Sequence, residues 1–214
     1  MTDPTDLSAL RAATVIAVLR APTAGAAVTA ADALVAGGVT GIEITYSTPD
    51  AAEAIRTVRE RHGEAVYLGA GTVLTEDHAS EAVAAGAQFL VSPGTDPAVT
   101  RAMIGTGVTV LSGAFTPSEV MSAARLGAQV VKLFPASLGG VALLKALRGP
   151  FPDLAFCPTG GVNPANLADW LAAGAVAVGA GGELCPAAAL HSGDWSAITA
   201  AAERFAAAAR AARS

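Results

Sequence analysis

The chain is poor in the residues that build disulfide frameworks and metal centres. Its 214 residues include two cysteines and three histidines. Cys157 and Cys185 lie far apart without a Cys-x-x-Cys pair, and no histidine has metal-ligand spacing with another histidine or with a cysteine. We therefore expect two reduced core thiols, no metal and no cofactor.

Clustered positive charge and long apolar runs are absent too. The formal net charge is -5 and the arginines are scattered, whereas a nucleic-acid surface needs basic residues gathered in a patch. Residues 1–6 are acidic, and no segment offers the roughly 18 uninterrupted apolar residues of a membrane span. We expect no nucleic-acid partner, no membrane association and a cytoplasmic location.

Two common enzyme signatures are also missing. No nucleophile-elbow pattern supports a Ser-His-Asp site. The segment Gly69-Ala70-Gly71 leads into Thr72 without the third glycine of a dinucleotide-binding fingerprint. Both kinds of site are therefore unsupported.

What the chain does have is a regular alternation of short, apolar, β-branched runs with longer alanine-rich stretches of helical period. This alternation predicts one domain over residues 1–214, with a short helix before the first strand and a final helix at the C-terminus. The eight predicted strands are Thr14–Arg20, Gly41–Thr45, Val66–Ala70, Gln88–Ser92, Val108–Ser112, Gln129–Leu133, Ala155–Pro158 and Ala175–Val178. The helices are predicted to begin near Thr23, Pro49, Thr75, Asp96, Thr116, Gly140, Asn163 and Asp194.

Four nearly identical joints close a helix just before a strand. Glycine C-caps are typical of such joints. They indicate a repeated β-α unit, and eight such units predict an α/β fold of the (β/α)8 TIM-barrel type, with a doubly wound open sheet as the alternative. The joints are Ala36-Gly37-Gly38-Val39, Ala85-Gly86-Ala87, Leu126-Gly127-Ala128 and Ala173-Gly174-Ala175.

Two charged residues interrupt otherwise apolar strands. Lys132 is one of only two lysines and lies in the apolar run from Val130 to Pro135, and Glu43 lies between two isoleucines. Strand alternation places both side chains inside the barrel. A buried amine that loses its proton becomes a nucleophile and condenses with a ketone to a Schiff base. A structural lysine paired with a carboxylate is the other interpretation.

Further polar groups follow the carboxyl ends of strands, where barrels of this class carry their active sites. Arg20 has a donor fork suited to a carboxylate or phosphate, and Thr72 and Thr159 offer hydroxyls or serve as turn residues. Glycine clusters follow the last two strands, where backbone amides and a helix start can hold phosphate. The candidate phosphate-binding residues are Gly160, Gly161, Gly181 and Gly182.

Taken in order, these motifs resemble the 2-keto-3-deoxy-6-phosphogluconate (KDPG) aldolases, a family that includes 4-hydroxy-2-oxoglutarate (KHG) aldolases and galactonate-pathway enzymes. The resemblance runs nearly end to end. It rests on the segments Val15–Arg20, Gly37–Thr45, Gly69–Leu74, Val91–Gly94, Lys132–Pro135 and Pro158–Val162.

The resemblance implies a class I aldolase, usually a homotrimer, that cleaves KDPG to pyruvate and glyceraldehyde 3-phosphate. Lys132 would form the Schiff base and Glu43 would be the general acid and base. The substrate-binding residues that it implies are Arg20 and Thr72 at the carboxylate end, Pro93 and Phe134 along the pocket, and Thr159 beside the sugar hydroxyls.

Two departures and two alternatives qualify this interpretation. Some family members carry an arginine two places before Pro49, where this chain has Ser47, and some carry a serine at the position of Gly182. Both changes remove donors for the phosphate. Gluconate-type members carry a threonine at the position of Thr159, whereas galactonate-type members carry an apolar residue, so the resemblance implies a gluconate-type substrate. A phosphate-binding barrel isomerase and a sugar-phosphate binding protein without activity are the competing functions.

Overall fold

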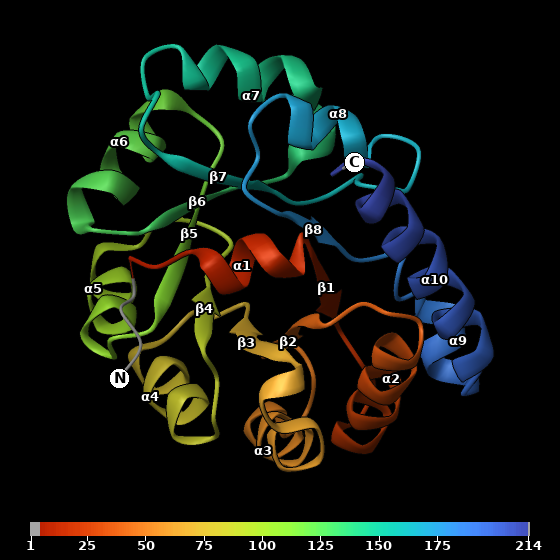
Figure 1. The fold of residues 1–214 in the computed structure, drawn as a ribbon. Coiled ribbons are helices and arrows are strands. Elements are labelled where there is room, and N and C mark those ends of the chain that lie inside the picture. Colours follow the sequence, from red (N-terminus) through yellow and green to blue (C-terminus); the bar gives the residue numbers. More distant parts are fainter. Residues whose placement is uncertain (1–4, 214) are drawn as a thin grey trace.

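The computed structural model describes residues 5–213; residues 1–4 and 214 of the predicted domain lie outside the described residues. Eight parallel strands form one sheet in the order β7-β6-β5-β4-β3-β2-β1-β8. A parallel bridge between Thr159 and Gly179 links the two ends of that sheet, so the strands curl into a barrel (Figure 1). The strands are β1 Val15–Leu19, β2 Gly41–Thr45, β3 Tyr67–Gly71, β4 Phe89–Val91, β5 Thr109–Ala114, β6 Val130–Leu133, β7 Ala155–Pro158 and β8 Val178–Ala180.

Helices surround this barrel and connect successive strands (Figure 1). The predicted TIM barrel is confirmed, and the open-sheet alternative is wrong. The α-helices are α1 Ser8–Ala13, α2 Ala24–Ala36, α3 Ala51–His62, α4 Glu76–Ala84, α5 Pro97–Gly105, α6 Pro117–Leu126, α7 Gly140–Arg148, α8 Leu167–Ala172, α9 Ala187–Ser192 and α10 Trp195–Ala211. Short 3-10 helices are η1 Gly63–Ala65 and η2 Ala136–Leu138.

Side-chain caps fix where four of the helices begin after a strand. Thr23 and Thr75 each accept a hydrogen bond from the backbone three residues on, and Asp96 accepts two. Thr116 and Glu119 form a complete capping box. Because capping satisfies backbone donors that the helix leaves unpaired, these residues hold the strand-to-helix loops at the rim in one shape.

The glycine joints behave as predicted at the opposite ends of the helices. Gly38, Gly86, Gly127 and Gly174 all have positive φ angles, between 86° and 104°. Only glycine adopts this conformation without steric cost, so these four joints end their helices and return the chain to the next strand.

The last two units differ from the prediction. The helix predicted near Asn163 begins at Leu167, because Asn163 and Asn166 form a side-chain-bonded turn first. Strand β8 begins at Val178, three residues later than predicted. The residues before it, Val176 and Ala177, have the apolar composition of a strand. They pack in the apolar cluster at the amino-terminal end of the barrel. Helix α9 falls in a predicted loop.

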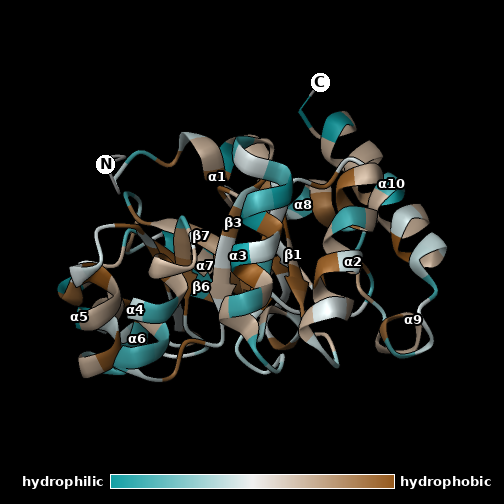
Figure 2. Cartoon of the chain, turned by 90° about the horizontal axis from the view of Figure 1, so that it is seen from below, coloured by the Kyte–Doolittle hydropathy of each residue, from teal (hydrophilic) through white to brown (hydrophobic). Residues whose placement is uncertain are grey.

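The amino-terminal half of the barrel interior is apolar and closed. Helix α1 lies across this end, and Leu10 from α1 is fully buried against strand residues (Figure 1). Figure 2, turned by 90°, shows α1 at one end of the barrel, with hydrophilic residues on the outer surfaces of α3 and α4. The apolar cluster comprises Leu10, Ile16, Phe89, Val91, Leu111, Val130, Cys157, Val176 and Ala177. Within the described residues, no helix is both long and apolar enough to cross a bilayer.

Candidate active site

The carboxyl half of the barrel interior contains the two charged side chains that the sequence predicts to point inward. Lys132 on β6 and Glu43 on β2 come from opposite sides of the barrel, and Nζ of Lys132 lies 3.9 Å from Oε1 of Glu43. Only 5% of Lys132 and 3% of Glu43 is exposed. The two charges therefore face each other across the interior, directly above its apolar half.

Two glycines allow close packing around this pair. A Cβ on Gly71 would overlap the carboxylate of Glu43, and a Cβ on Gly113 would overlap the backbone of Pro93. Gly113 is paired in register with Lys132. Gly71 thus leaves room for the Glu43 carboxylate, whereas Gly113, beside Lys132, lets the backbone of Pro93 approach β5 closely.

Glu43 is in an environment suited to holding a proton. Burial raises its pKa above the ordinary value of 4.5, and the positive charges of Lys132 and Arg20 lower it in part. Its Oε1 atom is buried and has no hydrogen-bond partner among the described residues. A buried carboxyl oxygen of this kind can accept a hydrogen bond from a ligand hydroxyl or, when protonated, donate one to it.

Arg20 and Thr72 lie at the rim, as predicted. Arg20 follows β1, and its Nε donates a hydrogen bond of 2.7 Å to Oγ of Ser47. Thr72 follows β3 and has a φ of 55°, a left-handed conformation that is unfavourable for a β-branched residue. Such strain is found where a backbone is held for function, so the structure marks Thr72 out independently of its side chain.

Pro93, Phe134 and Thr159 line the walls. The ring of Phe134 lies 5.1 Å from Nζ of Lys132, within the range of a cation-π contact. Thr159 is 93% buried and bridges β7 to β8 through Gly179, where a Cβ would overlap the Thr159 hydroxyl. The bridge keeps the Thr159 side chain in place at the point where the barrel closes.

The two glycine loops lie at the same rim. Gly160 and Gly161 have φ angles of 100° and 75°, so larger residues would be strained there. Gly182 has open space where a side chain would be. Helix α8 begins six residues after Gly161, so the loop itself, without an adjacent helix start, is what faces the cavity.

One cavity of about 340 Å³ brings all of the predicted site residues together. Sequence reasoning missed three of its lining residues, namely Val18, Val162 and Glu183. It also missed Ser47 as the partner of Arg20. Alternation along β1 was the available signal for Val18; no signal marked Glu183 as facing the site. The predicted residues that line the cavity are Arg20, Glu43, Thr72, Pro93, Lys132, Phe134, Thr159, Gly160, Gly161, Gly181 and Gly182.

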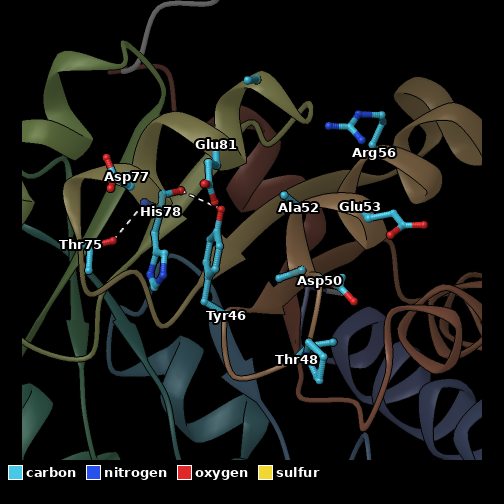
Figure 3. Close-up of a pocket in the computed structure, with 13 residues that line it drawn as sticks. Tyr46, Thr48, Asp50, Ala52, Glu53, Arg56, Thr75, Asp77, His78 and Glu81 are labelled. Carbon is cyan, nitrogen blue, oxygen red and sulfur yellow. Dashed lines mark hydrogen bonds between the residues drawn. The ribbon is translucent and has the colours of Figure 1, made fainter.

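A larger hollow of about 900 Å³ lies outside the barrel, between α3 and the β3–α4 segment. Figure 3 shows the Tyr46 ring stacked on His78 there, with ring centroids 4.0 Å apart, and the Tyr46 hydroxyl donating to the carbonyl oxygen of His78. Neither Lys132 nor Glu43 lines it. The buried ion pair therefore singles out the smaller cavity as the candidate active site.

The fold agrees with comparisons to known proteins. A family model described as KDPG and KHG aldolase matches residues 7–201. The 2-dehydro-3-deoxy-phosphogluconate aldolase of Treponema pallidum is 42% identical over 92% of this chain and 93% of its own length. The KHG/KDPG aldolase of Escherichia coli is 46% identical over 81% of each chain.

A solved structure gives the same result in three dimensions. The KDPG aldolase of Legionella pneumophila, with pyruvate captured as a covalent carbinolamine, superimposes with a TM-score of 0.85 at 34% identity, covering 95% of this chain and 98% of that one. A family model spanning most of the chain, close relatives over most of their length and a shared barrel place it without ambiguity. The chain belongs to the KDPG and KHG aldolase family.

Proposed function

We propose that this protein is a class I aldolase that cleaves 2-keto-3-deoxy-6-phosphogluconate to pyruvate and glyceraldehyde 3-phosphate. The observation that carries the proposal is the Lys132 amine, buried in the cavity 3.9 Å from the Glu43 carboxylate. An amine beside a proton-carrying group is what Schiff-base formation with a ketone requires.

In this mechanism, Nζ of Lys132 attacks C2 of the keto acid, and the carbinolamine loses water to give an iminium. Glu43, directly or through one water, takes the proton of the C4 hydroxyl as the C3–C4 bond breaks. The electrons of that bond move into the iminium, which becomes an enamine, and the aldehyde leaves. Glu43 then returns a proton to C3, and water hydrolyses the imine to release pyruvate and the free amine.

The raised pKa of Glu43 supports its double role. A carboxyl group with an ordinary pKa is a poor proton donor near neutral pH, whereas burial brings the protonated form within reach. We assign the substrate contact to its Oε1 atom, which has no hydrogen-bond partner among the described residues. Thr159, Phe134 and Pro93 line the cavity; we assign Thr159 to contact with the sugar hydroxyls, and Phe134 and Pro93 to the exclusion of water from the reacting atoms.

The two ends of the substrate are assigned to separate parts of the rim. We assign the carboxylate to Arg20 and Thr72, and the phosphate to the backbone amides of the two glycine loops. Gly182 offers a direct experiment on the phosphate, because a serine side chain fits the open space there. Gly182→Ser is expected to lower the KM for phosphorylated substrate a few-fold by adding a hydroxyl donor. An unchanged or higher KM would argue against phosphate at this loop.

The decisive experiment is reduction with borohydride in the presence of pyruvate. Mass spectrometry of the digested protein should find a stable adduct on Lys132. Lys145 is the matched control, because it is the only other lysine and is exposed on α7. Labelling that survives Lys132→Arg, or that lies on Lys145, would overturn the assignment.

Substrate preference needs a side-by-side measurement. Pyruvate release should be fastest on the phosphorylated gluconate-type substrate, slower on the galactonate epimer, and measurable on 4-hydroxy-2-oxoglutarate. Equal rates on all three would defeat the preference for the gluconate type. Isomerase activity without borohydride sensitivity would select the competing barrel isomerase.

We also propose a cytoplasmic homotrimer. Hydrophobic side chains remain exposed near the active-site rim, including Leu74 at 55% and Leu138 at 76%. Exposed apolar residues of this kind favour burial against another copy. Light scattering should give three times the 21.0 kDa chain mass, and a monomer that is active would refute the trimer. The two buried free cysteines suit a reducing compartment, which cell fractionation would test.

A further inference from the structure

A chain of hydrogen bonds connects Thr45, Ser47 and Arg20 at the rim of the cavity, and we call it the Arg20 relay. We propose that Ser47 is a positioning residue that orients the Arg20 guanidinium toward the substrate carboxylate. The inference rests on the proposed function, because the keto acid is what Arg20 would hold. It concerns a position where the family resemblance leads one to expect a second arginine.

The hydrogen bonds of this relay run in one direction. The buried Thr45 hydroxyl lies 3.1 Å from the carbonyl oxygen of Leu19, an atom that can only accept, so Thr45 donates to it. Having used its proton, the Thr45 oxygen accepts from the Ser47 hydroxyl at 2.8 Å. The Ser47 oxygen is then left to accept from Nε of Arg20 at 2.7 Å. The hydroxyls of Thr45 and Ser47 therefore each donate one hydrogen bond and accept one within the relay.

The residues on either side hold Ser47 in place. The Tyr46 ring stacks on His78 outside the barrel, and its hydroxyl is hydrogen-bonded there, as Figure 3 shows. The hydroxyl of Thr48 accepts a hydrogen bond of 3.0 Å from the backbone amide of Ala21, the residue after Arg20. Ser47 therefore sits between two anchored neighbours, and its hydroxyl has a fixed position relative to β1.

This fixed contact limits how Arg20 can bind an anion. Ser47 occupies Nε, and within residues 5–213 no hydrogen bond engages either Nη atom of Arg20. A guanidinium whose Nε is occupied presents its two Nη groups as a pair, which matches a carboxylate. Arg20 lines the active-site cavity, so this pair of donors faces the space that holds substrate.

An exposed arginine without the relay would sample many rotamers and lose entropy on binding. Ser47 removes part of that cost before the substrate arrives. The expected signature is weaker binding of the keto acid with little change in the chemical step. Loss of one hydrogen bond to a charged group corresponds to a change of about tenfold in affinity.

The experiment is a double-mutant cycle read out with pyruvate, which carries a carboxylate and no phosphate. The quantity measured is the pyruvate concentration that gives half-maximal borohydride trapping on Lys132, in the wild type, Ser47→Ala, Arg20→Ala and the double variant. Ser47→Ala should raise it about tenfold with kcat for aldol cleavage within about twofold. In the Arg20→Ala background, Ser47→Ala should have no further effect, because Ser47 acts only through Arg20.

Ser47→Thr serves as the conservative control, because it keeps the hydroxyl and should bind pyruvate as the wild type does. Both Arg20 and Ser47 are exposed, so these variants are expected to fold, which circular dichroism checks. Additive effects in the cycle would overturn the role of Ser47. A defect seen only with phosphorylated substrate would overturn the assignment to the carboxylate. If pyruvate and borohydride do not modify Lys132 in the wild-type protein, the proposed function is overturned, and this inference is overturned with it.

Discussion

The two halves of the barrel interior are built from the same strands but serve different purposes. In the amino-terminal half, which we call the lower level, Val130 of β6 packs among apolar residues that Leu10 of α1 covers. The carboxyl half is the upper level. Two residues further along the same strand, Lys132 faces Glu43 in an open cavity. Two residues along one strand thus separate the packed core from the candidate active site.

The glycines of β3 show the same division. A Cβ on Gly69 would overlap the ring of Phe89, whereas a Cβ on Gly71 would overlap the carboxylate of Glu43. One glycine admits an aromatic side chain to the apolar cluster, and the other admits a charged side chain to the cavity. The comparison indicates that the lower level contributes to stability and the upper level to chemistry. Matched substitutions at Gly69 and Gly71 can test this division.

The largest expected effect is at the upper level. Lys132→Met removes the amine while keeping a long apolar side chain, and kcat for aldol cleavage should fall by on the order of 10⁴-fold or more. Lys145→Met on the outer surface should leave kcat unchanged. Steady-state pyruvate release measures both. Substantial activity in Lys132→Met would show that the upper level is not the reactive one.

The paired glycines sharpen the comparison most directly. Gly71→Ala should displace the Glu43 carboxylate and lower kcat/KM about 100-fold, the usual result of misplacing a catalytic group by about 1 Å. Gly69→Ala should instead cost about 2 kcal/mol of unfolding free energy through overpacking against Phe89, with kcat/KM nearly unchanged. Urea unfolding and kinetics on both variants separate the effects. The reverse pattern would contradict the division.

A milder change tests the lower level alone. Phe89→Leu leaves a small void in the apolar cluster and should lower the unfolding free energy by about 1 to 2 kcal/mol, or the melting temperature by a few degrees. Activity measured well below the melting temperature should stay within about twofold of the wild type. A large loss of kcat in a folded variant would mean that the lower level also takes part in catalysis.

The pH dependence of stability distinguishes the two levels as well. Because the pKa of Glu43 is raised on folding, the native protein binds more protons than the unfolded chain above pH 4.5, so stability falls as pH rises from there through the raised pKa. The fall is at most about 1.4 kcal/mol per pH unit. Glu43→Gln should remove this component. Urea unfolding of both proteins across the pH range would show whether the two curves diverge.

The smallest effect concerns the thiols. Burial raises the pKa of Cys157 and of Cys185 to about 12 in each case. Neither should react with a thiol reagent at neutral pH until the protein unfolds, because the thiolate is the reactive form. Absorbance on reaction with Ellman's reagent, before and after adding guanidinium chloride, measures this. Rapid labelling of Cys157 in the native protein would show that the apolar cluster at the amino-terminal end is more open than its packing indicates.

Much of the barrel follows from local sequence. Strands Gly41–Thr45 and Ala155–Pro158 were predicted to the residue, because apolar runs of this kind are bounded by turn-forming neighbours. Strand β8 and helix α9 were not, because Val176 and Ala177 have strand composition but pack in the lower cluster, which only the closed barrel determines. Tertiary contacts decide boundaries that composition leaves open.

The site was more predictable than its support. Lys132 and Glu43 stand out because a charge inside an apolar run conflicts with its surroundings. Ser47 gives no such signal, since its importance depends on the position of Arg20, 27 residues earlier in the chain. Glu183 in the final glycine loop was missed because its importance also depends on where the fold places it.

Replacing Glu183 with glutamine should modestly strengthen binding of phosphorylated substrate, because it removes a negative charge from the rim where the phosphate is assigned.

The closed amino-terminal end has a kinetic consequence. Because α1 and the apolar cluster seal that end, every molecule that reaches Lys132 enters and departs by the opposite mouth. In the proposed mechanism, the fragment joined to the amine would lie deepest, and the other fragment would lie between it and solvent. The mechanism therefore predicts ordered release, with the aldehyde first and pyruvate last, and a reverse condensation that admits pyruvate before any acceptor aldehyde.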